Sequence, residues 1–344
     1  MKKWLKRIGL GLIALVLITY VWQFELINYG LLQLRGQLKV VNNTVPLQTF
    51  IDDPATPDSL RIKAELIEEI RKFAFDSLGI NYSDNYTEIY DQKGKPSMYV
   101  VTACDSFSFK PKTWKFPLLG SFPYKGFFEV EKAKALANEI KTKDSLEVDI
   151  RTAGGWSTLG WFKDPILSNM LNRSEGDLAS LLIHELTHGT LFVKDSVTFN
   201  ENLASFIGDN GAILFLESKY GKQAPQVLQY KAEIEDEEKF KSYVLIAANQ
   251  LDELYKGMAN ASREEKRLQK SKAMEAIQSN YDTLDFKSAL YKGYLKRRKP
   301  NNTFFMSYLR YNSQQALLES ELNLNFKGDL KAYLQYLKSK YPSL

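Results

Sequence analysis

Cysteine and histidine are almost absent from this chain of 344 residues. The single cysteine, Cys104, excludes an intramolecular disulfide framework and any zinc site built from several thiolates, so we expect it to pack in the core. Only two histidines occur, His184 and His188. Any metal site with imidazole ligands must therefore use one or both of them.

Long blocks of one charge sign are missing as well, and only short runs such as Glu235 to Glu238 and Arg297 to Lys299 occur. The 46 basic and 41 acidic residues are interleaved along the chain and leave a net charge of +5. A nucleic-acid-binding surface would require a basic stripe, so no nucleic-acid partner is expected. Internal repeats and low-complexity segments are also absent, and the length allows one large or two modest domains.

The two histidines form the ends of one motif, His184-Glu185-Leu186-Thr187-His188. Two histidines placed at random in such a chain would stand four residues apart roughly once in two hundred placements. The flanking residues have a helical apolar period, and Ser174 with Asp177 is typical of a helix start. Residues i and i+4 share one face of a helix, so both imidazoles can bind one ion.

One zinc ion is the cofactor that this motif predicts. Zinc takes imidazole and carboxylate ligands, and a catalytic site keeps one position for water. Glu185 follows the first histidine on the helix and would act as the general base rather than as a ligand.

Glu201 is the candidate third ligand. We expect the first helix to end near Val193 and a second helix to run from about Thr198 to Gly221. In an antiparallel helix hairpin, His188 and Glu201 would then face each other. The alternative is a capping box, in which Glu201 pairs with Thr198 at the helix start.

The sequence around this motif resembles the bacterial putative aminopeptidases, membrane-associated zinc proteins of the gluzincin type that contain the motif His-Glu-x-x-His. The resemblance covers residues 25–221, with a weaker echo from Asn301-Asn302 onward. Its blocks are Tyr29-Gly30, Gly36-Gln37-Leu38, Ile70 to Ala74, Leu78-Gly79, Trp114 to Pro117, Tyr124 to Phe128, Trp156 to Phe162 with Asp164-Pro165, the histidine motif, and Asp195 with Phe199-Asn200-Glu201. This chain has Trp156 where the family usually has tyrosine.

The resemblance implies a zinc metallopeptidase that hydrolyses peptide bonds in peptides or proteins, with aminopeptidase action as the family's label. His184, His188 and Glu201 would hold zinc, and Glu185 would be the base. Two alternatives stay open: a zinc endopeptidase, and a non-catalytic zinc-containing binding module of the cell envelope. The intact Glu185 disfavours the second alternative.

Several further residues are candidates for the site. An oxyanion donor is needed, and Tyr308 and Tyr311 are the choices. Asp195 and Asn200 are candidates to orient the ligands, although Asp195 is equally suited to a turn. The segment upstream of the motif supplies possible walls of a substrate cleft, or else a packed aromatic loop that supports the site: Trp156, Thr158, Gly160 and Trp161.

The predicted fold is α+β and mainly α-helical, with a zincin-like core that contains a small β-sheet. Strands are expected at 98–103 and 146–151, with an ordered loop region at 107–128. Helices are expected at 25–38, 60–78, 133–140, 224–256, 262–278, 304–319 and 328–339. The expected domains are an anchor or signal segment (1–24), the metallopeptidase core (25–221) and a helical C-terminal part that packs on it (222–344).

The first 24 residues predict where in the cell the protein is located. Four basic residues precede an apolar run from Ile8 to Trp22, and no small-residue cleavage site follows. As a helix this run would reach about 22 Å, less than the roughly 30 Å of a hydrocarbon core. We expect an uncleaved single-pass anchor in the bacterial inner membrane, with the N-terminus inside and the catalytic domain facing the periplasm or exterior.

Overall fold

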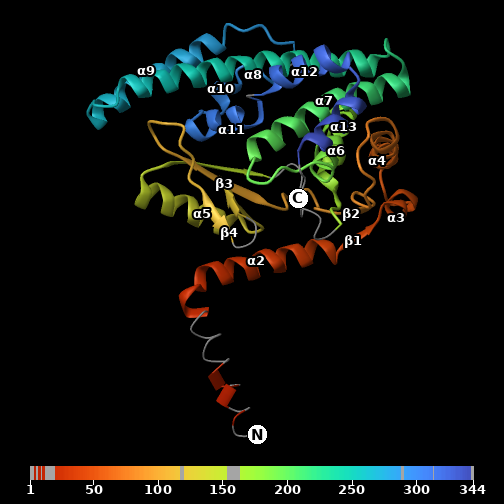
Figure 1. The fold of residues 1–344 in the computed structure, drawn as a ribbon, viewed down its shortest axis with the longest axis horizontal. Helices are drawn as coiled ribbons and strands as arrows, with labels where there is room; N and C mark the ends of the chain where they lie inside the picture. Colours follow the sequence, from red (N-terminus) through yellow and green to blue (C-terminus); the bar gives the residue numbers. More distant parts are fainter. Residues whose placement is uncertain are drawn as a thin grey trace. The chain divides into compact units, whose positions relative to one another are not determined.

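The computed structural model describes residues 4, 7–8, 10–11, 20–116, 120–152, 163–287, 290–312 and 314–341 (Figure 1). Its helices are α2 (Phe24–Val41), α3 (Leu47–Asp52), α4 (Asp58–Ser77), α5 (Val130–Glu139), α6 (Glu175–His188), α7 (Val197–Tyr220), α8 (Pro225–Gly257), α9 (Arg263–Tyr281), α10 (Tyr294–Arg297), α11 (Asn302–Asn312), α12 (Gln315–Phe326) and α13 (Leu330–Lys340). Its strands are β1 (Thr44–Pro46), β2 (Glu88–Tyr90), β3 (Tyr99–Cys104), β4 (Trp114–Phe116), β5 (Gly120–Phe122), β6 (Lys125–Phe127), β7 (Glu147–Thr152) and β8 (Ile166–Leu167). The prediction of an α+β fold dominated by helices is confirmed.

The sheets are small. The expected strands at 98–103 and 146–151 are β3 and β7, which pair antiparallel with Val101 opposite Ile150, and β6 flanks β3 on the other side. Cys104 ends β3 and is fully buried, as expected. A second sheet has the order β1-β2-β8, and β4 pairs with β5. The region 107–128 therefore contains three short strands, so its prediction as loop was wrong in part.

Helices α6 and α7 form a tightly packed antiparallel hairpin. The backbone N–H of Asp177 donates to Ser174 Oγ at 3.2 Å, which confirms the predicted helix start. A Cβ atom added at Gly208 would lie 2.8 Å from the carbonyl oxygen of Ser180 and 3.2 Å from Cβ of His184. Glycine at this position is therefore what allows the two helices to approach so closely.

The hairpin turn differs from its prediction. α6 ends at His188 rather than near Val193, and α7 begins at Val197. Asn200, which is fully buried, holds the loop closed, because its amide accepts from the N–H of Val193 at 2.9 Å and donates to the carbonyl of the same residue at 2.8 Å. After His188, the backbone groups of Val193 therefore bond to the Asn200 side chain instead of to other groups of a helix.

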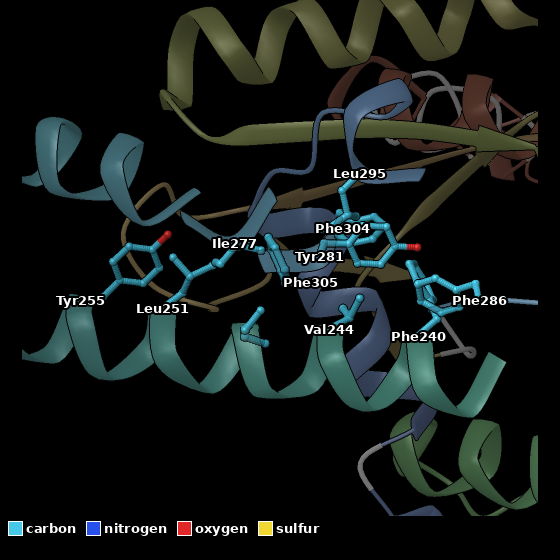
Figure 2. Close-up of a cluster of buried hydrophobic side chains, with 12 residues drawn as sticks. Phe240, Val244, Leu251, Tyr255, Ile277, Tyr281, Phe286, Leu295, Phe304 and Phe305 are labelled. Carbon is cyan, nitrogen blue, oxygen red and sulfur yellow. The ribbon is translucent and has the colours of Figure 1, made fainter. Parts of the chain in front are cut away.

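The C-terminal helices share an aromatic core. Figure 2 shows side chains from α8, α9 and α11 that point toward one another, with Phe286 and Leu295 beside them. Its central members are fully buried: Phe240, Val244, Leu251, Tyr281, Phe286, Leu295, Phe304 and Phe305. α11 also packs on β3 and β7, so this layer positions the sheet. The single helix expected at 304–319 is wrong, because α11 and α12 are separate helices.

The chain separates into two compact units, residues 1–44 and 45–344. The predicted boundary at residue 221 stays a prediction. Among the described residues, no helix is long and apolar enough to span a bilayer. That finding contradicts the expected transmembrane anchor and inner-membrane location. The apolar run that suggested them is short, and α2, which follows it, carries Glu25, Arg35 and Lys39.

Candidate metal centre

The α6–α7 hairpin brings two histidines and one glutamate together. His184 and His188 are one turn apart on α6, and Glu201 lies one turn into α7. The Nε2 atoms of the histidines are 3.2 Å apart, and Oε2 of Glu201 lies 3.6 Å from Nε2 of His184 and 3.7 Å from Nε2 of His188. All three side chains are largely buried, with 10–17% of each exposed.

These three distances fit the coordination of one small cation. Zinc binds nitrogen and oxygen at about 2.0–2.1 Å, so two ligand atoms of a tetrahedral site stand roughly 3.3 Å apart. The three atoms in the structure form a triangle with sides close to this length, and a point about 2.0 Å from each lies in its plane. His184, His188 and Glu201 could therefore hold a metal ion.

Electrostatics in this donor set favour the charged forms of Glu201 and His184, as the directions of their pKa shifts show. Burial by itself would raise the pKa of Glu201, but its contacts with His184 and His188 outweigh burial and lower that pKa. Burial would lower the pKa of His184, yet its hydrogen bond to Glu201 and the nearby acidic charges raise it. Glu201 points toward the histidines, and the residue that precedes α7 is Ser196 rather than Thr198. Both observations argue against a capping box between Glu201 and Thr198.

The outer nitrogens of the two imidazoles have different surroundings. Nδ1 of His184 lies 3.4 Å from Oγ of Ser205, one turn beyond Glu201 on α7. Nδ1 of His188 is buried and has no hydrogen-bond partner in the described part of the chain. When Nε2 faces a metal, Nδ1 carries the proton, so Ser205 can accept a hydrogen bond that orients His184.

Glu185 is half-buried on the same helix, and Tyr86 is an unexpected neighbour. The Tyr86 side chain is 1% exposed, its hydroxyl has no hydrogen-bond partner among the described residues, and its backbone has a φ of 63°. Burial raises the pKa of Tyr86 far above its usual value, and the charges of Glu185 and Asp164 add to the rise. No local sequence pattern pointed to this tyrosine.

A cavity of about 860 Å³ meets the metal centre at one of its residues, His184. His184 and Ser205 form part of its wall, and Tyr308 from α11 lines it too. The Tyr308 ring packs on Phe240 and Phe304, with centroids 5.4 and 5.0 Å away. The structure thus brings this predicted oxyanion donor to the cavity beside His184.

Other predicted site residues fall elsewhere. Asn200 acts through the loop after α6, and Asp195 lies exposed in that loop with a φ of 57°. Asp195 makes no hydrogen bond to the described nitrogen atoms of either histidine, which favours its role as a turn residue. Tyr311 is near the end of α11, and its side chain is outside the described part. The expected cleft walls, Trp156, Thr158, Gly160 and Trp161, also lie outside the described residues.

A charged cluster that the sequence did not reveal lies in the same cavity. Lys241 from α8 is 7% exposed, and its Nζ lies 3.1 Å from carboxylate oxygens of Glu237 and Glu238 and 3.8 Å from Oδ2 of Asp209. Oγ of Ser180 donates to Oδ1 of Asp209 at 2.7 Å. Ser205 and Asp209 follow Glu201 at helical steps of four, a signal that the sequence did contain.

The family model described as putative aminopeptidase matches residues 28–340. The chain belongs to this family. The match covers the hairpin, the cavity and the C-terminal helices, and so extends well beyond the resemblance at residues 25–221. No curated protein and no solved structure matches the chain.

Proposed function

We propose that the chain is a zinc-dependent metallopeptidase that acts as an aminopeptidase. The observation that carries this proposal is the convergence of His184, His188 and Glu201 within bonding distance of one cation, with Glu185 next to the first ligand. Membership of the putative aminopeptidase family supports a hydrolase of peptide substrates. The donor set of two imidazoles and one carboxylate favours zinc, because catalytic zinc sites use such triads.

Zinc bound by these residues would polarise a peptide carbonyl and make a water molecule more acidic. Glu185 then accepts a proton from the attacking water and passes it to the departing amine, so one side chain serves as base and acid. His184, His188 and Glu201 fix the position of the reaction relative to Glu185.

A donor for the developing oxyanion would come from the cavity wall, and Tyr308 is our candidate for this role. Burial raises the pKa of Tyr308, so its hydroxyl keeps its proton at neutral pH and can donate a hydrogen bond. Tyr311 stays a second candidate on the same helix. An ionised glutamate could not serve as this donor in place of either tyrosine, because a carboxylate without a proton only accepts hydrogen bonds.

The decisive experiment replaces the base and keeps the ligands. Glu185→Gln should retain one zinc ion per chain and lose at least about a hundredfold in peptide hydrolysis, the usual weight of a general base. Metal analysis and turnover of a peptide library measure the two properties. Glu264→Gln, an exposed change on α9, is the matched control. Full activity in Glu185→Gln would refute the mechanism, and a zinc-loaded wild type inert to every peptide would favour the binding module.

A further inference from the structure

A second cavity, of about 470 Å³, is lined by residues of α9, of the short helix Ile140–Asp144, of β7 and of the loop before α11. Its volume is within the range of pockets that bind small molecules. It shares no described lining residue with the cavity that meets His184, and the proposed peptidase mechanism does not use it.

Four cationic side chains line this second cavity, against one carboxylate. Arg263, Arg267 and Lys270 follow one another on α9 at steps of four and three, so they share one face of that helix. The fourth cation, Lys141, comes from the short helix. Glu147 is the only acidic residue among the described lining residues. The lining therefore has three positive charges in excess.

The one carboxylate is already engaged by other groups. Nζ of Lys270 donates to Oε1 of Glu147 at 2.5 Å, and the backbone N–H of Asn302 donates to Oε2 at 2.6 Å. The Lys270 side chain is largely buried, and its Nζ lies over the Phe107 ring, 5.9 Å from the centroid. Lys270 and Glu147 thus form a neutral pair in the cavity wall, and this pair leaves the charges of the other three cations unbalanced.

The other three cations have no acidic partner. Arg263, Arg267 and Lys141 are exposed, and none makes an ion pair or a side-chain hydrogen bond within the part of the chain that the structure describes. Nearby lysines do have partners, since Lys134 and Lys143 each bind a glutamate of α5. Like charges four residues apart on a helix destabilise it. An anion in the cavity would remove the repulsion between the two arginines.

A phosphate group is the anion that suits these three side chains best. A guanidinium group can bind two phosphate oxygens through parallel charge-assisted hydrogen bonds, which are roughly twice as strong as neutral ones. A phosphate ester of the kind found in phosphoserine carries about 1.5 to 2 negative charges at neutral pH, so it balances several cations better than a single carboxylate does. Phe107 and Met274 add apolar surface to the lining, which suits an organic group attached to the phosphate.

We propose that this second cavity binds a phosphate ester, with Arg263, Arg267 and Lys141 holding the phosphate group. The apolar part of the lining contacts the organic group of the ligand. The site is independent of the proposed peptidase activity, because none of its described residues belongs to the metal centre or to the cavity that meets His184.

A charge-matched pair of double variants tests this site. Arg263→Gln with Arg267→Gln removes two cations from the lining, whereas Lys266→Gln with Lys272→Gln removes two cations of α9 that lie outside it. Calorimetry on the full chain measures the binding of phenyl phosphate and inorganic phosphate at one ionic strength, set with sodium chloride. Wild type should bind phenyl phosphate more tightly than inorganic phosphate. The arginine variant should lose at least about tenfold in affinity for both, and the lysine variant should bind as wild type does. Lys141→Gln should also weaken binding.

Two results of this calorimetry would overturn the proposal. Equal losses in the two double variants would show attraction to net charge alone. Absence of wild-type binding at millimolar phenyl phosphate would show that the cavity holds no such ligand.

Thermal unfolding distinguishes a ligand site from a structural role of the arginines. Without phosphate, the arginine variant should melt at the wild-type temperature or about 1 °C above it, because a like-charge repulsion is gone. Phenyl phosphate should raise the melting temperature of wild type and not that of the variant. A variant that melts several degrees below wild type would show that the arginines stabilise the fold, and would count against the proposal.

Vesicles identify the source of the phosphate group. Wild type and the arginine variant are sedimented with phosphatidylcholine vesicles that contain or lack phosphatidic acid. Sedimentation that requires both phosphatidic acid and the arginines would assign the site to a lipid headgroup. Binding of phenyl phosphate without such a difference would assign it to a soluble phosphate ester.

Discussion

Two charged clusters lie on the same hairpin and have opposite compositions. Around Glu201, two imidazoles share one carboxylate, and among the described residues no lysine or arginine joins them. Around Lys241, one ammonium group is shared by three carboxylates. The first cluster has donor atoms arranged for a cation that the chain does not supply, whereas the second contains a cation of its own.

This contrast distinguishes buried charges that stabilise the fold from buried charges that could serve a function. A buried ion must be paired, because the cost of removing it from water is several kcal/mol. Lys241 satisfies that requirement from within the fold. His184, His188 and Glu201 would be completed by an added ion, which supports the proposal that the metal centre is the functional half of the pair. Three changes of charge or hydrogen bonding, at Glu201, Lys241 and Ser205, should expose the difference.

The largest effect is expected at the metal centre. Glu201→Ala removes the only carboxylate of the ligand triad and should lower zinc affinity by more than about a hundredfold, beyond the range for residues that merely support a ligand. Zinc titration of the metal-free protein measures the affinity, and the melting temperature of the variant should no longer rise with added zinc. Stoichiometric zinc at wild-type affinity would mean that another group is the third ligand.

Lys241→Met should instead damage the fold. It leaves Asp209, Glu237 and Glu238 without their common cation, at a cost of about 3 kcal/mol in the free energy of unfolding, at the lower end for buried pairs because the glutamates are partly exposed. Lys272→Met, at an exposed position of α9, is the control. Denaturant unfolding measures the change, and a loss below about 0.5 kcal/mol would show that Lys241 is dispensable for stability.

The same variant has a defined pH dependence. Burial would lower the pKa of Lys241, but the charges of Glu237, Asp209 and Glu238 raise it above the unfolded value of 10.5. Its stabilising contribution is therefore complete below pH 10.5 and is lost only as the pH rises through the folded pKa. Wild type and Lys241→Met should differ by a constant amount between pH 7 and 10 and converge above that range.

The candidate metal ligands were predictable from the sequence, and the cluster around Lys241 was not. Helical spacing puts His184 and His188 on one face, and one short turn brings Glu201 back toward them. Local rules therefore suffice to predict that these three side chains meet. Lys241 comes from α8, whose position beside the hairpin depends on tertiary packing such as that of Tyr230 on Gly176 of α6. Tyr86 likewise reaches Glu185 through the fold, from a loop with a left-handed backbone that tyrosine rarely adopts.

Predictions of where helices end and of how strands pair were incomplete for similar reasons. The apolar pattern continues past His188 through Leu191, yet the amide of Asn200 takes over the hydrogen bonds of Val193 and the helix ends. The parallel pairing of Ile89 with Ile166 joins segments far apart in the chain, which periodicity cannot indicate. The strand β7 was recognisable because it alternates clearly between polar and apolar residues.

The smallest expected effect tests whether the two clusters are independent. Ser205→Ala removes the oxygen 3.4 Å from Nδ1 of His184 and should lower zinc affinity about tenfold, because a ligand histidine that loses its outer hydrogen bond is less well oriented. Ser180→Ala, one turn away, removes the hydrogen bond to Asp209 and should leave zinc affinity unchanged. Zinc titration of both variants beside wild type gives the answer. If Ser180→Ala weakens zinc binding as much as Ser205→Ala does, the charge of Asp209 acts on His184 directly, and the metal centre and the lysine cluster must be treated as one electrostatic unit.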